Sequence, residues 1–198
     1  KRISCLKGNF WVRLLYIHPD HFNEDIIPVI QKDNRILPYF DIPFQSGDDT
    51  LIRAMNRKGS ASVYENLVQK IRKALPDASL RTTFLTGFPG ETDENAENTK
   101  KFLSVIQSDW SGCFPYSRED DTPAYSMKKR PAQKTAAVRA AVLESMQADI
   151  TRSRLAARTG KEYDVLIEEV VAGEEGFETG RAGFRAPEVV VFVFVGSA

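Results

Sequence analysis

The sequence predicts an α/β fold with a parallel sheet, followed by a long helix and a small antiparallel β-module. Three observations carry this prediction. Apolar segments alternate with amphipathic helical segments through residues 1–127, one helical pattern continues from Pro131 to about Arg158, and short β-type runs follow Gly160. Because parallel strands need crossover connections, the alternation indicates a barrel or a doubly wound sheet.

The first part of the chain contains four expected strands with helices between them. The segments with the apolar content and length of strands are Val12–Ile17, Tyr39–Phe44, Ser79–Thr86 and Gly112–Tyr116. The helical patterns cover Phe22–Gln31, Asp48–Asn56, Ser60–Leu75 and Glu91–Ile106. The last helix opens on polar and acidic residues typical of a helix N-terminus and places Phe102, Leu103 and Ile106 on one face. We expect that face to be buried against the sheet.

The long helix has an apolar residue at every fourth position, at Val138, Val142, Met146 and Ile150, with Arg or Lys on its remaining faces. Gly160 is a suitable residue to end it. The expected strands of the tail are Tyr163–Val170, Phe177–Arg181 and Val189–Val195, with a turn at Gly173–Gly176. So few strands cannot close a barrel, and the tail is predicted to be a partial one.

Composition excludes several classes of protein. The chain has 198 residues, 42% of them hydrophobic, and no apolar run approaches the roughly 18 residues of a membrane span. It shows no secretory signal pattern, and its 2 cysteines cannot form a disulfide framework. We expect a cytoplasmic, monomeric protein with no membrane partner.

The net charge of zero conceals a marked asymmetry along the chain. Residues 1–127 carry 16 Lys+Arg and 17 Asp+Glu, residues 128–161 carry 9 and 2, and residues 162–198 carry 2 and 8. The changes of sign coincide with the changes of pattern and predict a core at 1–127, a connecting helix at 128–160 and a tail domain at 161–198. An acidic tail repels phosphates and complements a basic protein, whereas a basic helix could lie along RNA. The charges alone therefore do not decide between a basic protein and RNA as the partner.

A strand running into Gly87-Phe88-Pro89-Gly90-Glu91 is the strongest sign of a binding site. Gly87 and Gly90 can adopt positive φ and let a ligand approach the backbone, while Pro89 stiffens the turn. The turn follows a strand at the end where α/β folds place their sites. The alternative is an ordinary tight turn between a strand and a helix.

Motifs over nearly the whole chain resemble the radical SAM methylthiotransferases. They are Tyr39–Gly47 (YFDIPFQSG), Leu51–Arg57 (LIRAMNR), Arg81–Glu91 (RTTFLTGFPGE), Tyr116–Glu119 (YSRE) and Thr122–Ala124 (TPA). The resemblance implies the second half of a radical SAM partial (β/α) barrel with parallel strands, then a long helix and a partial TRAM domain. It also implies S-adenosyl-L-methionine (SAM) and 4Fe-4S clusters as cofactors of the parent enzyme.

Two segments resemble the RimO branch of this family in particular, namely Asp41 and Ala186-Pro187-Glu188. That branch adds a methylthio group to the β-carbon of an aspartate in a small-subunit ribosomal protein. The resemblance therefore implies a ribosomal-protein partner, which we expect to contact the acidic tail. The alternatives are the MiaB-like branch, which modifies tRNA, and a non-catalytic substrate-binding fragment.

The resemblance also implies SAM-binding residues at the carboxyl ends of the strands. They are Gln45, Ser46, Arg81, Thr83, Gly87, Phe88, Pro89, Gly90, Glu91 and Tyr116. Amide and hydroxyl groups suit the ribose or amino-acid part of SAM, an arginine suits its carboxylate, and an aromatic edge can flank adenine. Gln45 and Ser46 could instead cap the next helix, and Tyr116 could belong to the core.

The chain departs from the family at the cluster-binding loop. Family catalysis needs a C-x3-C-x2-C loop whose thiolates hold a 4Fe-4S cluster, and no such loop occurs here. Cys5 and Cys113 are expected to be a surface residue and a small core hydrophobe. We therefore expect a fragment of a longer enzyme that has no catalytic residue and no metal site of its own and is inactive alone.

Overall fold

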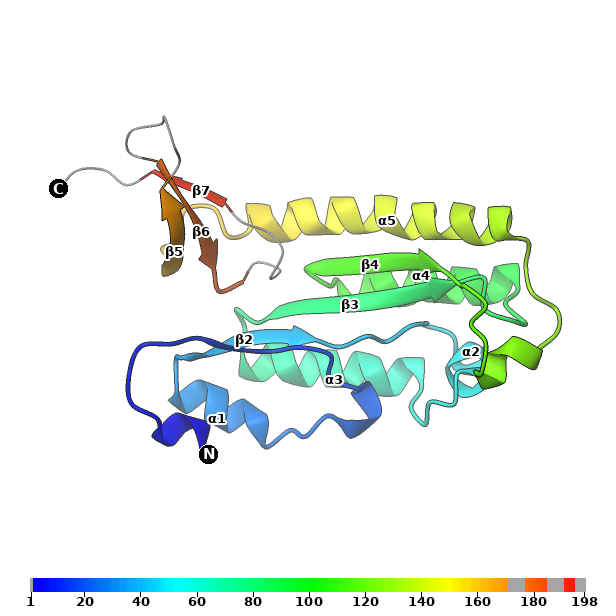
Figure 1. Cartoon of the computed structure of the whole chain (residues 1–198), viewed down its shortest axis with the longest axis horizontal. Coiled ribbons are helices and arrows are strands. Elements are labelled where there is room, and N and C mark those ends of the chain that lie inside the picture. Colours follow the sequence, from blue (N-terminus) through cyan, green and yellow to red (C-terminus); the bar gives the residue numbers. More distant parts are fainter. Residues whose placement is uncertain (1, 171–176, 185–190, 195–198) are drawn as a thin grey trace.

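A computed structural model describes residues 2–170, 177–184 and 191–194 (Figure 1). Its main sheet is parallel and contains β1 (Val12–Leu14), β2 (Ile36–Asp41), β3 (Ser79–Thr86) and β4 (Trp110–Pro115). The strand order β1-β2-β3-β4 follows the chain. Each crossover therefore steps to the next strand, as in the wall of a barrel, and the predicted parallel α/β architecture is confirmed.

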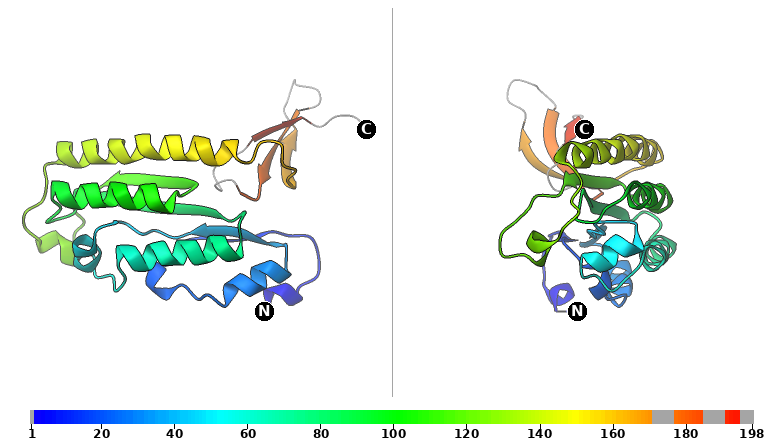
Figure 2. Two further views of the ribbon diagram at one scale, coloured as in Figure 1. Left: turned by 180° about the vertical axis from the view of Figure 1, so that it is seen from behind. Right: turned by 90° about the vertical axis from the view of Figure 1, so that its right-hand side faces the viewer.

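Helices cover one face of this sheet (Figure 2). They are α1 (Ile26–Lys32), α3 (Ala61–Ala74), α4 (Asp93–Ile106) and α5 (Gln133–Ala156). The short α2 (Asp49–Ala54) lies at the carboxyl end of the sheet, and 3-10 turns occur at Ile3–Cys5, Pro19–His21 and Pro123–Ser126. The loop containing the last of these turns lies on the opposite side from the helices (Figure 2). No helix in the described part of the chain has the length and apolar character needed to cross a membrane.

The predicted strand was Tyr39–Phe44, and both ends of β2 lie three residues earlier in the sequence. The chain after Asp41 nevertheless stays beside β3, because the N–H of Ile42 donates to the carbonyl of Arg81 at 2.9 Å and that of Gln45 donates to Thr83 at 2.8 Å. Regular pairing ends because Pro43 has no N–H and Gln45 has a φ of 71°. The irregular segment carries several predicted site residues to the carboxyl edge.

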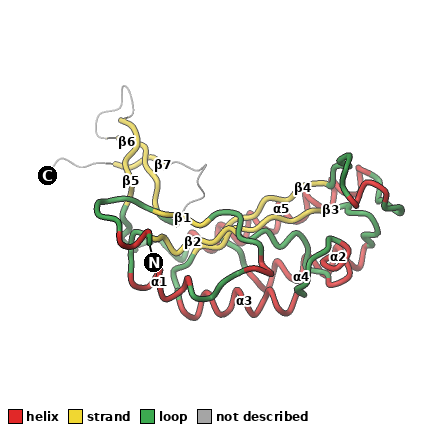
Figure 3. Tube along the Cα trace, turned by 60° about the horizontal axis from the view of Figure 1, so that its bottom comes forward, coloured by secondary structure: helices red, strands yellow, loops and turns green. Residues whose placement is uncertain are grey.

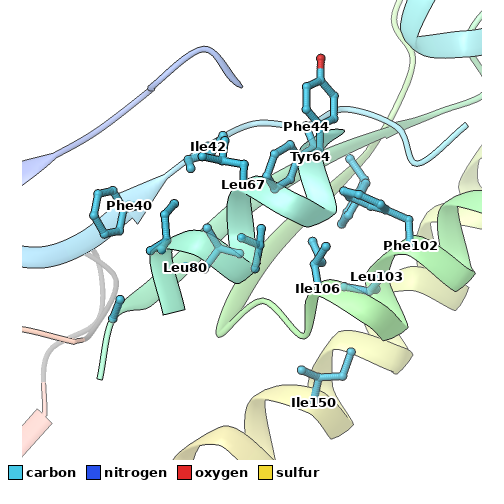
Figure 4. Packing of buried hydrophobic residues seen from close by; sticks show 14 of the residues in the cluster. Phe40, Ile42, Phe44, Tyr64, Leu67, Leu80, Phe102, Leu103, Ile106 and Ile150 are labelled. Atoms are coloured by element: carbon cyan, nitrogen blue, oxygen red, sulfur yellow. The ribbon is translucent and has the colours of Figure 1, made fainter. Parts of the chain in front are cut away.

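The core lies between the sheet and the helices, and α4 contributes Phe102, Leu103 and Ile106, as predicted (Figure 4). The Phe102 ring packs edge-on against Phe44 at 5.4 Å and against Phe84 at 6.3 Å. α4 begins two residues after the predicted Glu91, because Thr92 is its N-cap and forms a reciprocal capping box with Asn95.

The buried face of α5 follows only part of the apolar pattern spaced four apart, because Ile150 is buried and Met146 packs against the core. Val138 and Val142 are 56% and 40% exposed. The buried residues of this helix are Ala136, Ala140, Leu143, Gln147 and Ile150. The Gln147 amide is satisfied because its Nε2 donates to the carbonyl of Ser108 at 2.8 Å. The alanines allow α5 to approach the sheet closely.

A second sheet of three antiparallel strands follows α5, as predicted for the tail (Figure 3). Its strands are β5 (Val165–Val170), β6 (Phe177–Ala182) and β7 (Val191–Phe194). It lies near the amino ends of the main strands, where Trp110 Nε1 donates to the carbonyl of Phe184 at 3.3 Å. The predicted turn at Gly173–Gly176 and the Ala186-Pro187-Glu188 motif lie outside the described residues.

The two cysteines occupy the environments that the sequence indicated. Cys5 is exposed and Cys113 is buried. Burial raises the pKa of the Cys113 thiol from 9.0 to about 11. Because the thiolate is disfavoured in the folded state, this group contributes stability below the unfolded pKa, and that contribution is lost as pH rises toward 11.

We therefore expect iodoacetamide at mildly alkaline pH to alkylate Cys5 in the folded chain and to leave Cys113 unmodified until denaturant is added. Mass spectrometry of tryptic peptides measures both sites in one sample. Comparable labelling of the two thiols without denaturant would contradict the buried position of Cys113.

Candidate functional site

The turn after β3 has the predicted backbone conformation, with a φ of 77° at Gly87 and 89° at Gly90. Its N–H groups, however, donate within the protein. Gly87 N donates to Glu91 Oε2 at 2.6 Å, and Gly90 N donates to the carbonyl of Lys129 at 2.9 Å. A ligand at this edge would therefore depend mainly on side chains for its hydrogen bonds.

Glu91 is an internal partner in this arrangement. Its side chain is 2% exposed and lies 2.6 Å from Arg139 Nη1, while Arg139 Nη2 donates to Asp93 Oδ1 at 2.6 Å. Since Arg139 belongs to α5, the carboxylate connects the turn to this helix. Among the predicted site residues, Glu91 thus holds the turn in place.

Gly87 is needed for packing on α5. A Cβ at position 87 would lie 2.3 Å from the Cβ of Ala136, whereas a Cβ at position 90 would meet nothing within 4 Å. We expect Gly87→Ala and Gly90→Ala each to cost about 1–2 kcal/mol of unfolding free energy for positive φ. Only Gly87→Ala should lose about 1–3 kcal/mol more through the clash.

Urea denaturation of the two glycine variants measures this difference, and Gly90→Ala is the matched control. Equal losses in the two variants would show that α5 yields to the added methyl group, and would remove the packing role of Gly87.

Ser46 is also engaged inside the protein. Its hydroxyl lies 3.2 Å from Thr99 Oγ1 and accepts from the N–H of Asp48 at 3.1 Å. Asp48 in turn caps α2 by accepting from the N–H groups of Thr50 and Leu51. Ser46 therefore supports the start of α2 only through Asp48, which is the N-cap in place of Gln45 or Ser46.

Arg81 lies on the sheet face opposite the helices, directly across from Asp41 in the strand register. Its Nη1 atom is 3.6 Å from Asp41 Oδ2, and Asp41 is 2% exposed. The guanidinium thus already faces an internal carboxylate. Binding of a ligand carboxylate by Arg81 would have to compete with this pair.

Three predicted residues fit a polar ligand better. The side chains of Gln45 and Thr83 make no hydrogen bond within the described residues. The Tyr116 hydroxyl is buried and also lacks a hydrogen-bond partner there, although its ring is fixed edge-on to Phe88 at 5.4 Å. A buried hydroxyl without a partner costs about 1–3 kcal/mol, so an acceptor atom of a ligand would relieve that cost.

An open cavity of about 630 Å³ lies at the carboxyl ends of β3 and β4. Gly87 and Tyr116 line it, together with Arg118, Tyr125 and the basic segment 128–130. Its size is typical of small-molecule sites. Sequence reasoning noticed the basic segment only as a possible RNA contact, and the cavity could not be predicted because it joins two loops that are distant in sequence.

The residues present do not fit an iron-sulfur cluster. The sequence holds 2 cysteines, one exposed and one buried in β4. In the described ranges no group of three or more His, Cys, Asp or Glu side chains is placed to hold a metal ion. Cluster binding needs several converging thiolates.

The chain is similar to enzymes from different bacteria that carry the same name. The chain is 52% identical to the ribosomal protein uS12 methylthiotransferase RimO of Treponema denticola, over 96% of this chain and 42% of that protein. It is 40% identical to the enzyme of the same name from Thermotoga maritima, over 98% of this chain and 45% of that protein. The chain thus spans less than half the length of these relatives.

The architecture also has a solved counterpart. Coproporphyrinogen III oxidase (HemN) from Escherichia coli, a radical SAM enzyme, matches with a TM-score of 0.57 and 17% identity, over 72% of this chain and 32% of its own. At that identity the likeness shows the fold alone. The sequence model of the Radical SAM superfamily matches residues 4–103, half of the chain and most of the parallel sheet. The chain therefore belongs to the radical SAM superfamily.

Proposed function

We propose that this chain is part of a radical SAM methylthiotransferase that modifies ribosomal protein uS12, at the β-carbon of an aspartate. The observation that carries the proposal is 52% identity to an enzyme of that name over 96% of the chain. Membership of the superfamily and the parallel sheet agree with it. The partial length of the match makes the activity a property of the longer protein.

Gln45, Thr83 and Tyr116 would hold SAM at the carboxyl edge, with Phe88 fixing the Tyr116 ring. SAM would supply the methyl group and, on reductive cleavage, a radical. The Gln45 amide both donates and accepts, as a ribose hydroxyl pair requires, and the Thr83 hydroxyl can accept from the amino group. Gly90 leaves open space beside its Cα, while Pro89 stiffens the turn.

The charges of α5 favour a protein partner over tRNA. Most cations on and just after this helix form ion pairs with carboxylates of the same chain. The pairs are Arg139 with Glu91 and Asp93, Arg152 with Asp149, Arg154 and Arg158 with Asp109, and Lys161 with Asp77. Few charges of the helix itself are left to neutralise phosphates, so the support for the tRNA alternative shrinks mainly to the basic segment 128–130.

We assign residues 161–198 to a partial TRAM domain, on the basis of the three antiparallel strands β5–β7. The described strands of this segment lie near the amino edge of the main sheet, and the cavity lies at the carboxyl edge. The 24 residues of α5 separate the two by roughly 36 Å, about the size of a small domain. A basic ribosomal protein of that size can contact the tail and still reach the cavity.

Titration calorimetry with SAM tests the cofactor part of the proposal. We expect saturable binding that Gln45→Ala and Thr83→Val each weaken about 3- to 10-fold, the value of one net hydrogen bond. Thr50→Val is the matched control, because Thr50 is exposed on α2. Absence of SAM binding, or equal weakening by the control, would reject these assignments.

The substrate part needs a complete enzyme. Residues 1–198 can replace the matching segment of the Treponema denticola relative, and mass spectrometry of uS12 and of tRNA then reports the modified product. We expect methylthiolated uS12 and unmodified tRNA. Modified tRNA would select the MiaB-like alternative instead.

A further inference from the structure

Four cations line the open cavity at the carboxyl ends of β3 and β4, and none has an acidic partner within the described ranges. They are Arg118, Lys128, Lys129 and Arg130. The cations of α5, by contrast, are largely paired. The carboxylates Glu119, Asp120 and Asp121 belong to the same loop but do not line the cavity. All the charged residues of the described lining are therefore cations, and the cavity suits an anion.

Arg118 is held ready to bind one. Its Cζ lies 3.6 Å from the centre of the Tyr125 ring, and its Nε donates to the carbonyl of Tyr125 at 3.1 Å. The two Nη groups have no hydrogen-bond partner within the described residues. An arginine with its plane fixed and both terminal nitrogens available suits bidentate binding of a carboxylate or phosphate.

The basic segment 128–130 is held in place as well. Lys129 has a φ of 59°, and its carbonyl accepts from Gly90 N, so the turn after β3 fixes this segment. A non-glycine residue with positive φ costs free energy and tends to occur at binding sites. α5 begins just after the segment without a side-chain cap, which leaves amide N–H groups of its first turn beside the cavity lining.

We propose that this cavity binds a side-chain carboxylate of the acceptor polypeptide, with Arg118 as its bidentate partner and residues 128–130 supplying the positive potential. This inference rests on the proposed function and names how the acceptor is held. Tyr116 also lines this cavity, and its hydroxyl, which has no hydrogen-bond partner within the described residues, would add a donor for the bound acceptor or cofactor.

The charge distribution favours a polypeptide over RNA. A phosphate backbone needs a continuous row of cations, because each neutralised phosphate adds to the affinity. Here the cations surround one cavity, and three carboxylates follow Arg118 directly in the sequence. Residues 162–198 carry a net charge of −6. On an otherwise basic protein, a single carboxylate complements the positive cavity, and the basic surface complements the acidic tail.

Fluorescence anisotropy with the full chain tests the inference. The probes are a short labelled lysine- and glycine-rich peptide with one central aspartate, and the same peptide with asparagine. We expect the wild type to bind the aspartate peptide about tenfold more tightly, equivalent to one charge-assisted bidentate contact. Arg118→Gln should abolish that preference. Lys134→Gln, an exposed lysine outside the cavity lining, should retain it.

SAM affinity measured on the same samples separates the two proposals. Arg118→Gln should bind SAM like the wild type and lose only the aspartate preference. An aspartate preference without SAM binding would reject the proposed cofactor site and leave the carboxylate site standing. Equal binding of the two peptides by the wild type would overturn the inference. Tighter, Arg118-dependent binding of a single-stranded RNA oligonucleotide would overturn it too, in favour of a phosphate site.

Discussion

Asp109→Asn is expected to lower the free energy of unfolding by about 3 kcal/mol, because it removes a carboxylate that opposes several arginines at the amino end of β4. Asp109 is 4% exposed. Its Oδ2 accepts from the N–H of Leu80 at 2.9 Å, and its Oδ1 lies 3.1 Å from Arg154 Nε and 3.5 Å from Arg158 Nη2.

A third arginine adds to this cost. Arg72 Nη2 lies 4.0 Å from Asp109 Oδ2. Burial and the neighbouring Arg154 lower the pKa of Arg72, whereas Asp109 raises it. Without the carboxylate, the guanidinium groups would repel one another in a partly desolvated site. Their partial exposure places the expected loss at the lower end of the range for buried ion pairs.

Urea denaturation measures this loss, with Asp149→Asn as the control. Asp149 pairs with Arg152 on the surface of α5, and both side chains are more than 70% exposed. We expect the control to change stability by less than about 0.5 kcal/mol. Similar small losses in both variants would show that the Asp109 cluster is a solvated surface network.

Glu91→Ala is expected to cost about 3 kcal/mol for a related reason. It leaves Arg139, whose side chain is 13% exposed, without its buried partner, and it leaves Gly87 N without an acceptor. The turn after β3 and the start of α5 would then separate more easily. We therefore expect SAM affinity to fall together with stability.

Glu94→Ala, three residues further along the chain, provides the control. Glu94 is exposed in the first turn of α4, where a carboxylate stabilises by about 0.3–1 kcal/mol through the helix dipole. Paired urea titrations and SAM calorimetry compare the two variants. A Glu91 variant that unfolds like the Glu94 variant would mean that Asp93 alone suffices to hold Arg139.

The two acidic residues act at opposite edges of the same interface. Glu91 connects α5 to the carboxyl edge of the sheet, and Asp109 connects it to the amino edge. Because α5 leads from the cavity to the three-stranded tail sheet, these two contacts set the position of the tail relative to the cavity.

Local patterns were enough to predict much of this architecture. β3 occupies its predicted range, the apolar face of α4 is buried, and the tail forms three antiparallel strands. Gly87 and Gly90 adopt the positive φ that their turn suggested. These features depend on residue period and turn chemistry within a few neighbouring positions, which the order of residues specifies directly.

Contacts between segments that are distant in the sequence depend on the tertiary structure and could not be predicted from local patterns. The four-residue spacing of apolar residues in α5 does not distinguish the buried Ala136 and Ala140 from the exposed Val138 and Val142, because the close approach of helix and sheet selects small side chains. The basic composition of this helix suggested RNA binding, but in the structure its arginines form ion pairs with Asp109 and Glu91. Such pairs join residues about 40–50 positions apart in the sequence. The packing of the helix on the sheet decides which partner a charged side chain contacts, and its neighbours in the sequence do not.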